Sequence, residues 1–130
     1  MHRVEIVKAF FEALERSDDK TAKSLLHQEA VVWHNFDMTE KPFAASIAQI
    51  GMLKSVLEFY GYAEGHYEST ENGVLVRHIL VAKVPGGPEL RAPTIVYVTF
   101  KDDKIVRAEE YVDTNTIAPL TAFLVAQQGA

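Results

Sequence analysis

Cysteine is absent from the 130-residue sequence, and this absence excludes several kinds of chemistry. Without a thiol the chain can form no disulfide framework, no thiolate nucleophile and no sulfur-ligated metal site. The composition is compatible with a reducing compartment. The residues from Met1 to Glu5 run directly into an amphipathic pattern and lack the apolar core and cleavage site of a secretory signal. We therefore expect a cytoplasmic protein.

Long hydrophobic runs and positive charge are also scarce. No apolar stretch approaches the roughly 20 residues that a membrane-spanning helix requires, so we expect no membrane partner. The formal net charge is −5, and lysine and arginine do not gather on one predicted face. Because this charge opposes a phosphate backbone, nucleic acid is not an expected partner.

The remaining composition is that of an ordinary globular protein. Hydrophobic residues make up 48% of the chain and charged residues 24%. A chain of this length can bury a core of its own, and the sequence contains no repeat, linker or low-complexity segment. We expect a single domain over residues 1–130.

The two halves of the chain carry different hydrophobic patterns. Helical spacing predominates in the first half, whereas four β-rich runs separated by turn signals fill most of the second. The expected elements are a helix over 3–16, a short helix from Ser17-Asp18-Asp19 to about 28, a strand over 30–35, a loop over 36–42, a helix over 43–60 that ends at Gly61, strands over 62–70, 74–84, 90–101 and 104–113, and a final helix over 117–125.

This order predicts an α+β fold in which helices pack on one face of an antiparallel meander. The runs 74–84 and 94–100 are apolar or β-branched on both alternating faces. Such strands indicate that the second face of the sheet is also buried. A homodimer through this outer sheet face would bury it.

Three strings within this order carry a resemblance to a known family. They are Phe10-Phe11-Glu12-Ala13-Leu14, Val31-Val32-Trp33-His34-Asn35 and the run from Lys104 to Asp113. With the order of the elements, they resemble the nuclear transport factor 2-like superfamily, in particular its SnoaL-like polyketide cyclases and limonene epoxide hydrolases. The resemblance implies a cone-shaped α+β barrel in which helices pack over a curved, mainly antiparallel sheet and enclose a pocket. Members include isomerases, cyclases, dehydratases, hydrolases and non-catalytic binders, so fold alone does not fix the function.

The resemblance makes Glu110 the leading catalytic candidate, because the cyclases and epoxide hydrolases carry an acidic residue at this position of the last strand. Alternation places Ala108, Glu110 and Val112 on one strand face. A carboxyl between small apolar neighbours on a pocket wall would be partly desolvated, which raises its pKa and suits it to general acid or base catalysis. The alternative is that Glu109 and Glu110 form a solvated edge.

The first strand supplies two further candidates, Trp33 and Asn35, which alternate onto one face. They match the aromatic and Asn positions by which the related enzymes orient a water or a substrate oxygen. An amide can donate and accept at once, which suits this role. The alternative is a core tryptophan and a turn-forming asparagine.

Arg77 is the third catalytic candidate, because it shares an apolar strand face with Ile79 and Val81 and such a cation needs an anion. It matches the arginine of the epoxide hydrolases' Arg-x-Asp pair and would face Glu110. Ile79 stands where the aspartate of that pair would be, so we do not expect epoxide hydrolase activity. The alternative for Arg77 is a structural ion pair.

Ketosteroid isomerase activity is not expected either. The resemblance would require a tyrosine in the first helix and an aspartate on the first strand, and Phe10 and Asn35 stand at these positions. The residues expected to bind a ligand are Trp33, Phe10, Phe11, Val81, Val112 and Asp113, although Asp113 is favoured as a turn or capping group for the final helix.

The five histidines lack the close spacing of a metal chelate, so we expect neither a metal nor a cofactor. Alternation assigns His34 and His78 to the second sheet face or a dimer contact. His78 and Tyr97 become pocket residues only if a bulge changes the register.

Two functions of different kinds follow. The first is cofactor-independent acid/base catalysis by Glu110 on a small, mostly apolar molecule, of isomerase, cyclase, dehydratase or hydrolase type. The alternative is a non-catalytic module of the same fold, either one that binds a hydrophobic ligand in the pocket or a dimeric interaction protein whose pocket is packed shut by Phe10, Phe11, Met52 and Phe59.

Overall fold

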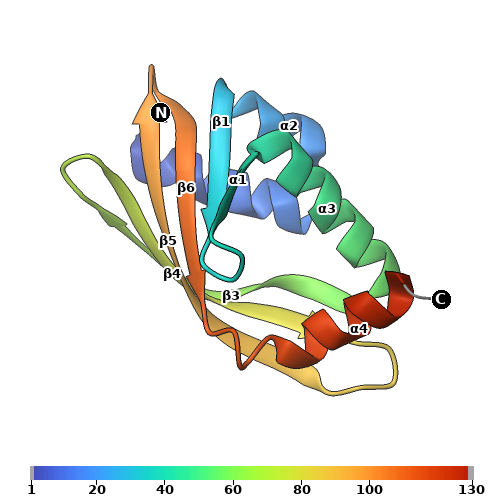
Figure 1. Cartoon of the computed structure of the whole chain (residues 1–130). Coiled ribbons are helices and arrows are strands. Elements are labelled where there is room, and N and C mark those ends of the chain that lie inside the picture. The colour runs from blue at the N-terminus through green and yellow to red at the C-terminus, as the bar shows by residue number, and fades with distance from the viewer. Residues whose placement is uncertain (1, 129–130) are drawn as a thin grey trace.

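The computed structural model describes residues 2–128 and contains four helices and a six-stranded sheet (Figure 1). The elements in chain order are α1 (Arg3–Glu15), α2 (Asp19–Ser24), β1 (Leu26–His34), β2 (Thr39–Pro42), α3 (Phe43–Val56), β3 (Phe59–Ser69), β4 (Gly73–Lys83), β5 (Glu89–Lys101), β6 (Lys104–Val112) and α4 (Ala118–Gln128).

The predicted first helix and the predicted meander are both confirmed. The apolar positions of α1 form one stripe, and Val7, Phe10 and Leu14 on it are almost completely buried. Helical spacing of this kind buries one face and exposes the other. Strands β3, β4, β5 and β6 pair antiparallel in sequence order, as their turn signals predicted.

The second helix is shorter than predicted. The Asp18 carboxylate accepts a hydrogen bond from the Thr21 backbone N–H at 3.1 Å, which fixes the beginning of α2. The helix ends at Ser24 rather than near residue 28, because Leu26 already pairs with Ile105 of β6. Pairing with a distant strand overrides the local helical pattern.

The segment 36–42, predicted to be a loop, contains strand β2. Its residues pair antiparallel with the end of β1, from Val31 opposite Pro42 to His34 opposite Thr39. The connecting turn places Met38 at a φ of 56°, with its N–H donating to the His34 carbonyl. Only this pairing identifies the polar run as a strand.

The third helix also ends earlier than predicted, at Val56 instead of residue 60. Leu57 is extended, and the Glu58 N–H donates to the Lys83 carbonyl of β4. Tyr60 therefore belongs to β3, and Gly61 is not a helix cap. Apolar spacing alone cannot separate a helix end from the beginning of a buried strand.

The sheet is curved and mixed, with the strand order β2-β1-β6-β5-β4-β3. Strand β1 runs parallel to β6, whereas every other neighbouring pair is antiparallel. The expected α+β fold with helices over a curved, mainly antiparallel sheet is confirmed. The expected barrel is not closed, since β2 and β3 each have only one neighbour.

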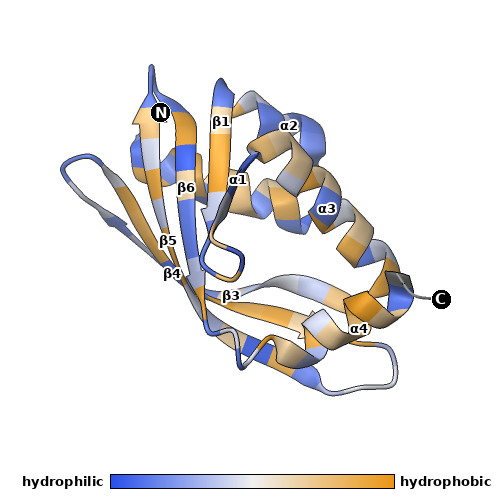
Figure 2. Ribbon diagram, viewed as in Figure 1, coloured by the Kyte–Doolittle hydropathy of each residue, from blue (hydrophilic) through white to orange (hydrophobic). Residues whose placement is uncertain are grey.

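Helices α1 and α3 lie on the concave side of the sheet, and α4 lies near the C-terminal end of α3 (Figure 1). Figure 2 shows hydrophobic residues along the strands and along α3 and α4. One core cluster joins α1 to the sheet, and a second joins Leu53 and Leu57 of α3 to Ala82 of β4 and Leu120 of α4. Within residues 2–128, no helix combines the length and the apolar character that crossing a bilayer requires.

Candidate functional site

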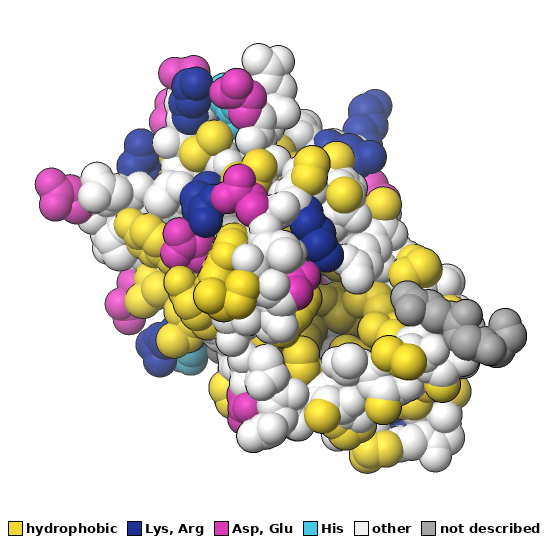
Figure 3. Space-filling view, viewed as in Figure 1, with side chains coloured by type: hydrophobic (Ala, Val, Ile, Leu, Met, Phe, Trp, Pro, Cys, Tyr) yellow, Lys and Arg dark blue, Asp and Glu magenta, His cyan; other side chains and the backbone are white. Residues whose placement is uncertain are grey.

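A cavity of about 790 Å³ lies between the concave face of the sheet and the helices. Figure 3 shows a hollow lined mainly by hydrophobic side chains on this side of the molecule. Its polar residues come from several elements and are His34, Asp37, Ser46, Gln49, Tyr60, Tyr62, Glu110, Thr114 and Thr121. The lining includes Phe10, Phe11, Leu14, His34, Phe36, Ser46, Gln49, Ile50, Leu53, Tyr60, Tyr62, Leu80, Val96, Ala108, Glu110, Val112, Leu120 and Leu124.

Glu110 stands on the cavity wall, on β6. Ala108, Glu110 and Val112 all line the cavity, as expected from alternation along the strand. The Glu110 side chain is 25% exposed. Loss of solvation by burial raises the pKa of its carboxyl to about 7, because an apolar environment disfavours the charged form.

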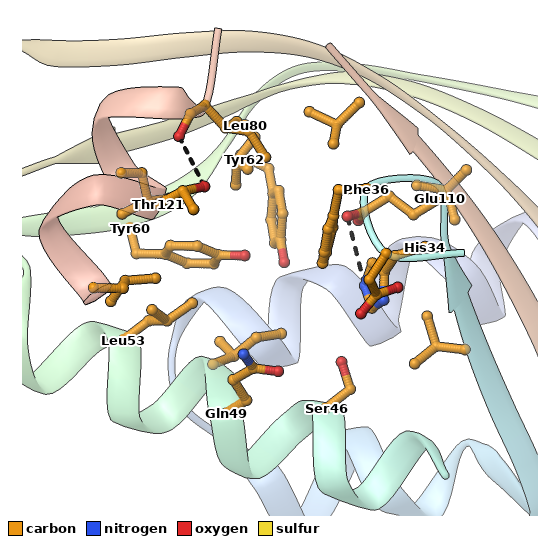
Figure 4. Close-up of a pocket in the computed structure, with 18 of the residues that line it drawn as sticks. His34, Phe36, Ser46, Gln49, Leu53, Tyr60, Tyr62, Leu80, Glu110 and Thr121 are labelled. Carbon is orange, nitrogen blue, oxygen red and sulfur yellow. Dashed lines mark hydrogen bonds and ion pairs between the residues drawn. The ribbon is translucent and has the colours of Figure 1, made fainter. Parts of the chain in front are cut away.

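His34 lies directly opposite Glu110 on the neighbouring parallel strand β1. Its Nε2 atom is 3.7 Å from Oε1 of Glu110, and Figure 4 shows the two side chains converging in the cavity. Burial lowers the pKa of His34, with the charge of Lys41 adding to the effect and that of Asp37 opposing it. At neutral pH the imidazole is therefore uncharged, and the contact is not an ion pair.

The expectation that His34 serves the outer face is wrong, and the reason lies in the parity of β1. Ala30 and Val32 are buried in the core cluster, so the residue two further along also points inward. Val31 and Trp33 are apolar like Ala30 and Val32, so the sequence does not distinguish the two faces of this strand. The wrong parity came from matching Trp33 and Asn35 to a family motif.

Two tyrosines that the sequence analysis did not select, Tyr60 and Tyr62 of β3, also line the cavity. Their rings meet edge to face, with centroids 5.9 Å apart. Figure 4 shows both hydroxyl groups pointing into the same part of the cavity. Burial raises the pKa of both phenols, and the charge of Glu110 adds to the rise in each, so both stay protonated at neutral pH.

The position of the tyrosines was obscured by the assignment of residue 60 to a helix. In a strand beginning at Phe59, Tyr60 and Tyr62 share one face by their spacing of two residues. The structure leaves Glu58 and Phe59 exposed before them, beyond the buried stripe of α3. In the sequence, the two-residue spacing of the tyrosines was the signal for a strand.

The apolar residues expected to bind a ligand divide into two groups. Phe10, Phe11 and Val112 line the cavity. Val81 is buried but is not part of the lining, because it follows the cavity-lining Leu80 directly and so points to the opposite face of β4.

Trp33 and Asn35 do not line the cavity, which corrects the roles expected for them. The Trp33 ring packs against Tyr111, 5.2 Å away between centroids. The Asn35 amide donates to the Val112 carbonyl and accepts from the Val112 N–H, both at 3.0 Å. Both amide atoms therefore hold the residue after β1 to the end of β6, outside the cavity lining.

Arg77 is likewise placed away from Glu110. Its side chain is 53% exposed and lies 3.6 Å from the carboxylate of Glu68 on β3, which is the structural ion pair considered as an alternative. The inward face of β4 carries Val74, Val76 and His78 instead. Because both faces of this strand are apolar, the sequence does not reveal which one points inward.

Asp113 accepts hydrogen bonds from the Asn115 N–H at 3.0 Å and from the Thr116 hydroxyl at 2.9 Å. It is exposed and holds the turn before α4, outside the cavity lining. This is the structural role that the sequence favoured. Tyr97, whose hydroxyl lies 3.4 Å from that of Thr70, is also outside the lining.

His78 is buried, 4% exposed, and packs against α1 rather than serving the second sheet face or a dimer contact as expected. Its ring stacks on Tyr62 with centroids 4.6 Å apart and meets Phe11 edge to face. Burial lowers the pKa of His78 to about 4. Within residues 2–128, no three histidine or acidic side chains are grouped to hold a metal ion.

A second hollow, of about 550 Å³, includes residues of the outer sheet face. Ile95 and Tyr111 pair across β5 and β6 there, and each is 44% exposed. Arg77 and Glu64 contribute charged groups to the same hollow. This region combines exposed apolar side chains with charges of both signs.

Comparison with solved structures places the architecture in a known class. A nuclear transport factor 2-like protein from Burkholderia xenovorans superposes with a TM-score of 0.75 at 22% identity, covering 90% of this chain and 93% of its own. IdmH, a candidate polyketide cyclase from Streptomyces antibioticus, gives 0.77 at 14% identity and covers 100% of both chains. TerC, co-crystallised with polyporic acid, gives 0.78 at 19% identity, with 91% and 96% covered.

The chain therefore has the nuclear transport factor 2-like fold, as its sequence resemblance implied. No protein-family model matches the sequence. No curated protein matches it either. At these identities the likeness concerns the fold, and the chemistry must be argued from the site itself.

Proposed function

We propose that the cavity binds a small, mostly apolar molecule with an oxygen function, and that Glu110 transfers protons on it without a cofactor. The observation that carries this proposal is a carboxyl with a pKa of about 7 on the wall of a largely apolar cavity. Near neutral pH such a group is present in both its ionised and protonated forms. It can therefore accept a proton and return it within one reaction.

The reaction type that fits is proton transfer at a carbon next to a carbonyl group. The Glu110 carboxylate takes the C–H proton, and the electron pair of that bond moves to the carbonyl oxygen to give an enolate. The protonated carboxyl then returns the proton to the same or another carbon, so that no atom is gained or lost. Isomerisations and cyclisations of carbonyl compounds begin with this step.

His34 has a positioning role in this scheme. It faces Glu110 from β1 at 3.7 Å, and the ring of Phe36 packs against it with centroids 4.7 Å apart. An uncharged imidazole at this distance fills the space beside the carboxyl without lowering its pKa as a cation would. A cyclase or isomerase role agrees with the candidate polyketide cyclase among the structural neighbours.

Deuterium exchange into 2-tetralone, an apolar bicyclic ketone with acidic C–H bonds beside its carbonyl, tests the proposal. Proton NMR in D₂O follows loss of the C1 signal with and without protein. We expect the protein to accelerate exchange and Glu110→Gln to remove at least about 100-fold of that acceleration, the usual range for a general base. Arg77→Ala, which alters an exposed pair outside the cavity, is the matched control and should exchange at the unmodified rate.

The alternative function is a binding module that holds the same kind of ligand without chemistry. In that case 2-tetralone binds, but its exchange rate equals that of buffer and Glu110→Gln changes nothing. Equal exchange by the unmodified protein and Glu110→Gln would contradict catalysis by this residue.

A proposal about the assembly and the cellular location of the protein accompanies the proposed function. We propose one domain over residues 1–130 that forms a homodimer in the cytoplasm through the outer sheet face. Exposed Ile95 and Tyr111 support this choice of surface, since neighbouring apolar side chains on a sheet face are covered in many assemblies.

A further inference from the structure

Helix α3 carries two polar side chains, Ser46 and Gln49, on the stripe that faces the cavity. They are three residues apart and are therefore neighbours on one face of the helix. Figure 4 shows both polar ends directed from the helix into the cavity. The rest of this wall is apolar and consists of Phe43, Ile50 and Leu53. The polar pair thus interrupts an otherwise apolar helix face.

The Ser46 hydroxyl is buried without a partner from the chain. Ser46 is 7% exposed. In Ser24 and Ser55, which also lie in helices, the hydroxyl donates to the backbone carbonyl three residues earlier, at 2.6 Å in each case. Within residues 2–128, Ser46 makes no such bond, and Figure 4 marks no hydrogen bond from Ser46 or Gln49. An unpaired buried hydroxyl costs roughly 1–3 kcal/mol, so this position favours a bound molecule that supplies the missing partner.

The charges around the cavity indicate which chemical group fits beside α3. Among the described residues, the lining contains the carboxyl groups of Asp37 and Glu110 but no lysine or arginine. His34 is uncharged at neutral pH, because burial lowers its pKa. A carboxylate or phosphate on the ligand would therefore meet negative charge and no cation. A neutral polar group meets no such repulsion.

We propose that Ser46 and Gln49 form a subsite for a hydroxyl group of the ligand, which assigns the substrate to the apolar hydroxy ketones. This inference rests on the proposed function, in which Glu110 acts beside the carbonyl group of the same molecule. A hydroxyl can accept a hydrogen bond from Ser46 and donate one to the amide oxygen of Gln49 at the same time. It also completes the hydrogen bond that Ser46 lacks within the chain.

Hydroxylated forms of 2-tetralone test this subsite. 5-Hydroxy-, 6-hydroxy- and 7-hydroxy-2-tetralone place one hydroxyl at different distances from the carbonyl on an unchanged skeleton. Calorimetry with each compound and with 2-tetralone gives the hydroxyl preference, defined as the ratio of the two dissociation constants. We expect at least one hydroxylated probe to bind about three- to tenfold more tightly than 2-tetralone, the range of one hydrogen bond.

Substitutions on α3 should remove this preference. Ser46→Ala and Gln49→Leu should each reduce the ratio, and the double variant should bring it to about one, with 2-tetralone binding unchanged or tighter. A general loss of folding would weaken both compounds alike and leave the ratio unchanged. Ser55→Ala is the matched control, because it removes a hydroxyl from the same helix but Ser55 is exposed and outside the cavity lining. Its ratio should equal that of the unmodified protein.

The methyl ether of the preferred probe separates a hydroxyl from an oxygen that only accepts. The ether keeps the oxygen as an acceptor but has no proton to donate to Gln49. We expect it to lose most of the preference. An ether that binds as tightly as the hydroxylated probe would overturn the assignment to a hydroxyl group.

The outcomes separate the subsite from the proposed function. No hydroxyl preference in the unmodified protein, or a preference that persists in the double variant, would overturn the subsite even if Glu110-dependent exchange is observed. Glu110→Gln should keep the preference. A preference that depends on Ser46 and Gln49, together with no Glu110-dependent exchange, would retain the subsite and refute the catalytic proposal.

Discussion

The side chains of His34 and Glu110 face each other across neighbouring parallel strands, with 3.7 Å between Nε2 and Oε1. This separation is too long for a hydrogen bond but short enough for strong electrostatic coupling if both groups were charged. Burial shifts both pKa values toward the neutral forms, upward for the acid and downward for the base. The pair is therefore uncharged over a pH range in which an exposed pair would be ionised.

Carbon NMR of the Glu110 carboxyl should show an apparent pKa of about 7. Glu110→Gln identifies the signal by its loss. Because His34 is neutral when Glu110 ionises, His34→Gln should leave this pKa within about one unit of its original value, a shift that corresponds to 1.36 kcal/mol. A larger rise in His34→Gln would mean that the histidine is charged beside the carboxylate.

The pH dependence of folding stability should differ between the unmodified protein and Glu110→Gln. The raised pKa of Glu110 contributes stability below the unfolded value of about 4.5, and this contribution is lost as the pH rises through about 7. His78, with its pKa lowered to about 4, acts in the opposite sense: its contribution is present above about 6.5 and is lost as the pH falls toward 4.

The contributions of Glu110 and His78 to the free energy of unfolding offset each other between about pH 4.5 and 6.5. The informative quantity is therefore the difference in this free energy between Glu110→Gln and the unmodified protein. Urea unfolding of both proteins, measured from pH 4.5 to 8, isolates the Glu110 effect because the histidine contribution is common to both. We expect Glu110→Gln to gain roughly 3 kcal/mol relative to the unmodified protein over this range. A constant difference would contradict a buried, protonated Glu110.

Asn35→Ala should destabilise the fold without altering the cavity. The amide makes two hydrogen bonds to the Val112 backbone, and its removal leaves a carbonyl and an N–H without these partners. We expect a loss of roughly 1–3 kcal/mol in the free energy of unfolding, with 2-tetralone affinity unchanged. If ligand affinity or exchange fell instead with stability intact, a substrate-orienting role for Asn35 would be supported.

The outer sheet face can be tested by placing a charge on it. Light scattering of the unmodified protein should give the mass of a dimer, and Ile95→Lys should give the mass of a monomer. Met52→Lys serves as the matched control, since Met52 is also exposed but lies on α3, away from the sheet. A dimer that persists in Ile95→Lys would place the interface elsewhere.

Elements whose residues carry a consistent local signal could be predicted from the sequence. The amphipathic stripe of α1, the four meander strands and their turns were all predicted, because each depends on spacing and turn chemistry within a few residues. Glu110 was selected from a family resemblance together with its small apolar neighbours. Its inward direction followed from the two-residue period of β6.

For residues whose local pattern was ambiguous, packing between distant segments fixed the contacts that they make. Both faces of β4 are apolar, so only packing against α1 turned His78 inward and left Arg77 to pair with Glu68. Pairing with β4 ended α3 early and brought Tyr60 into the cavity, and parallel pairing of β1 with β6 set His34 opposite Glu110. These contacts join residues far apart in the chain. Local propensity carries no information about such partners, because the free energy that selects them arises only when distant surfaces are buried together.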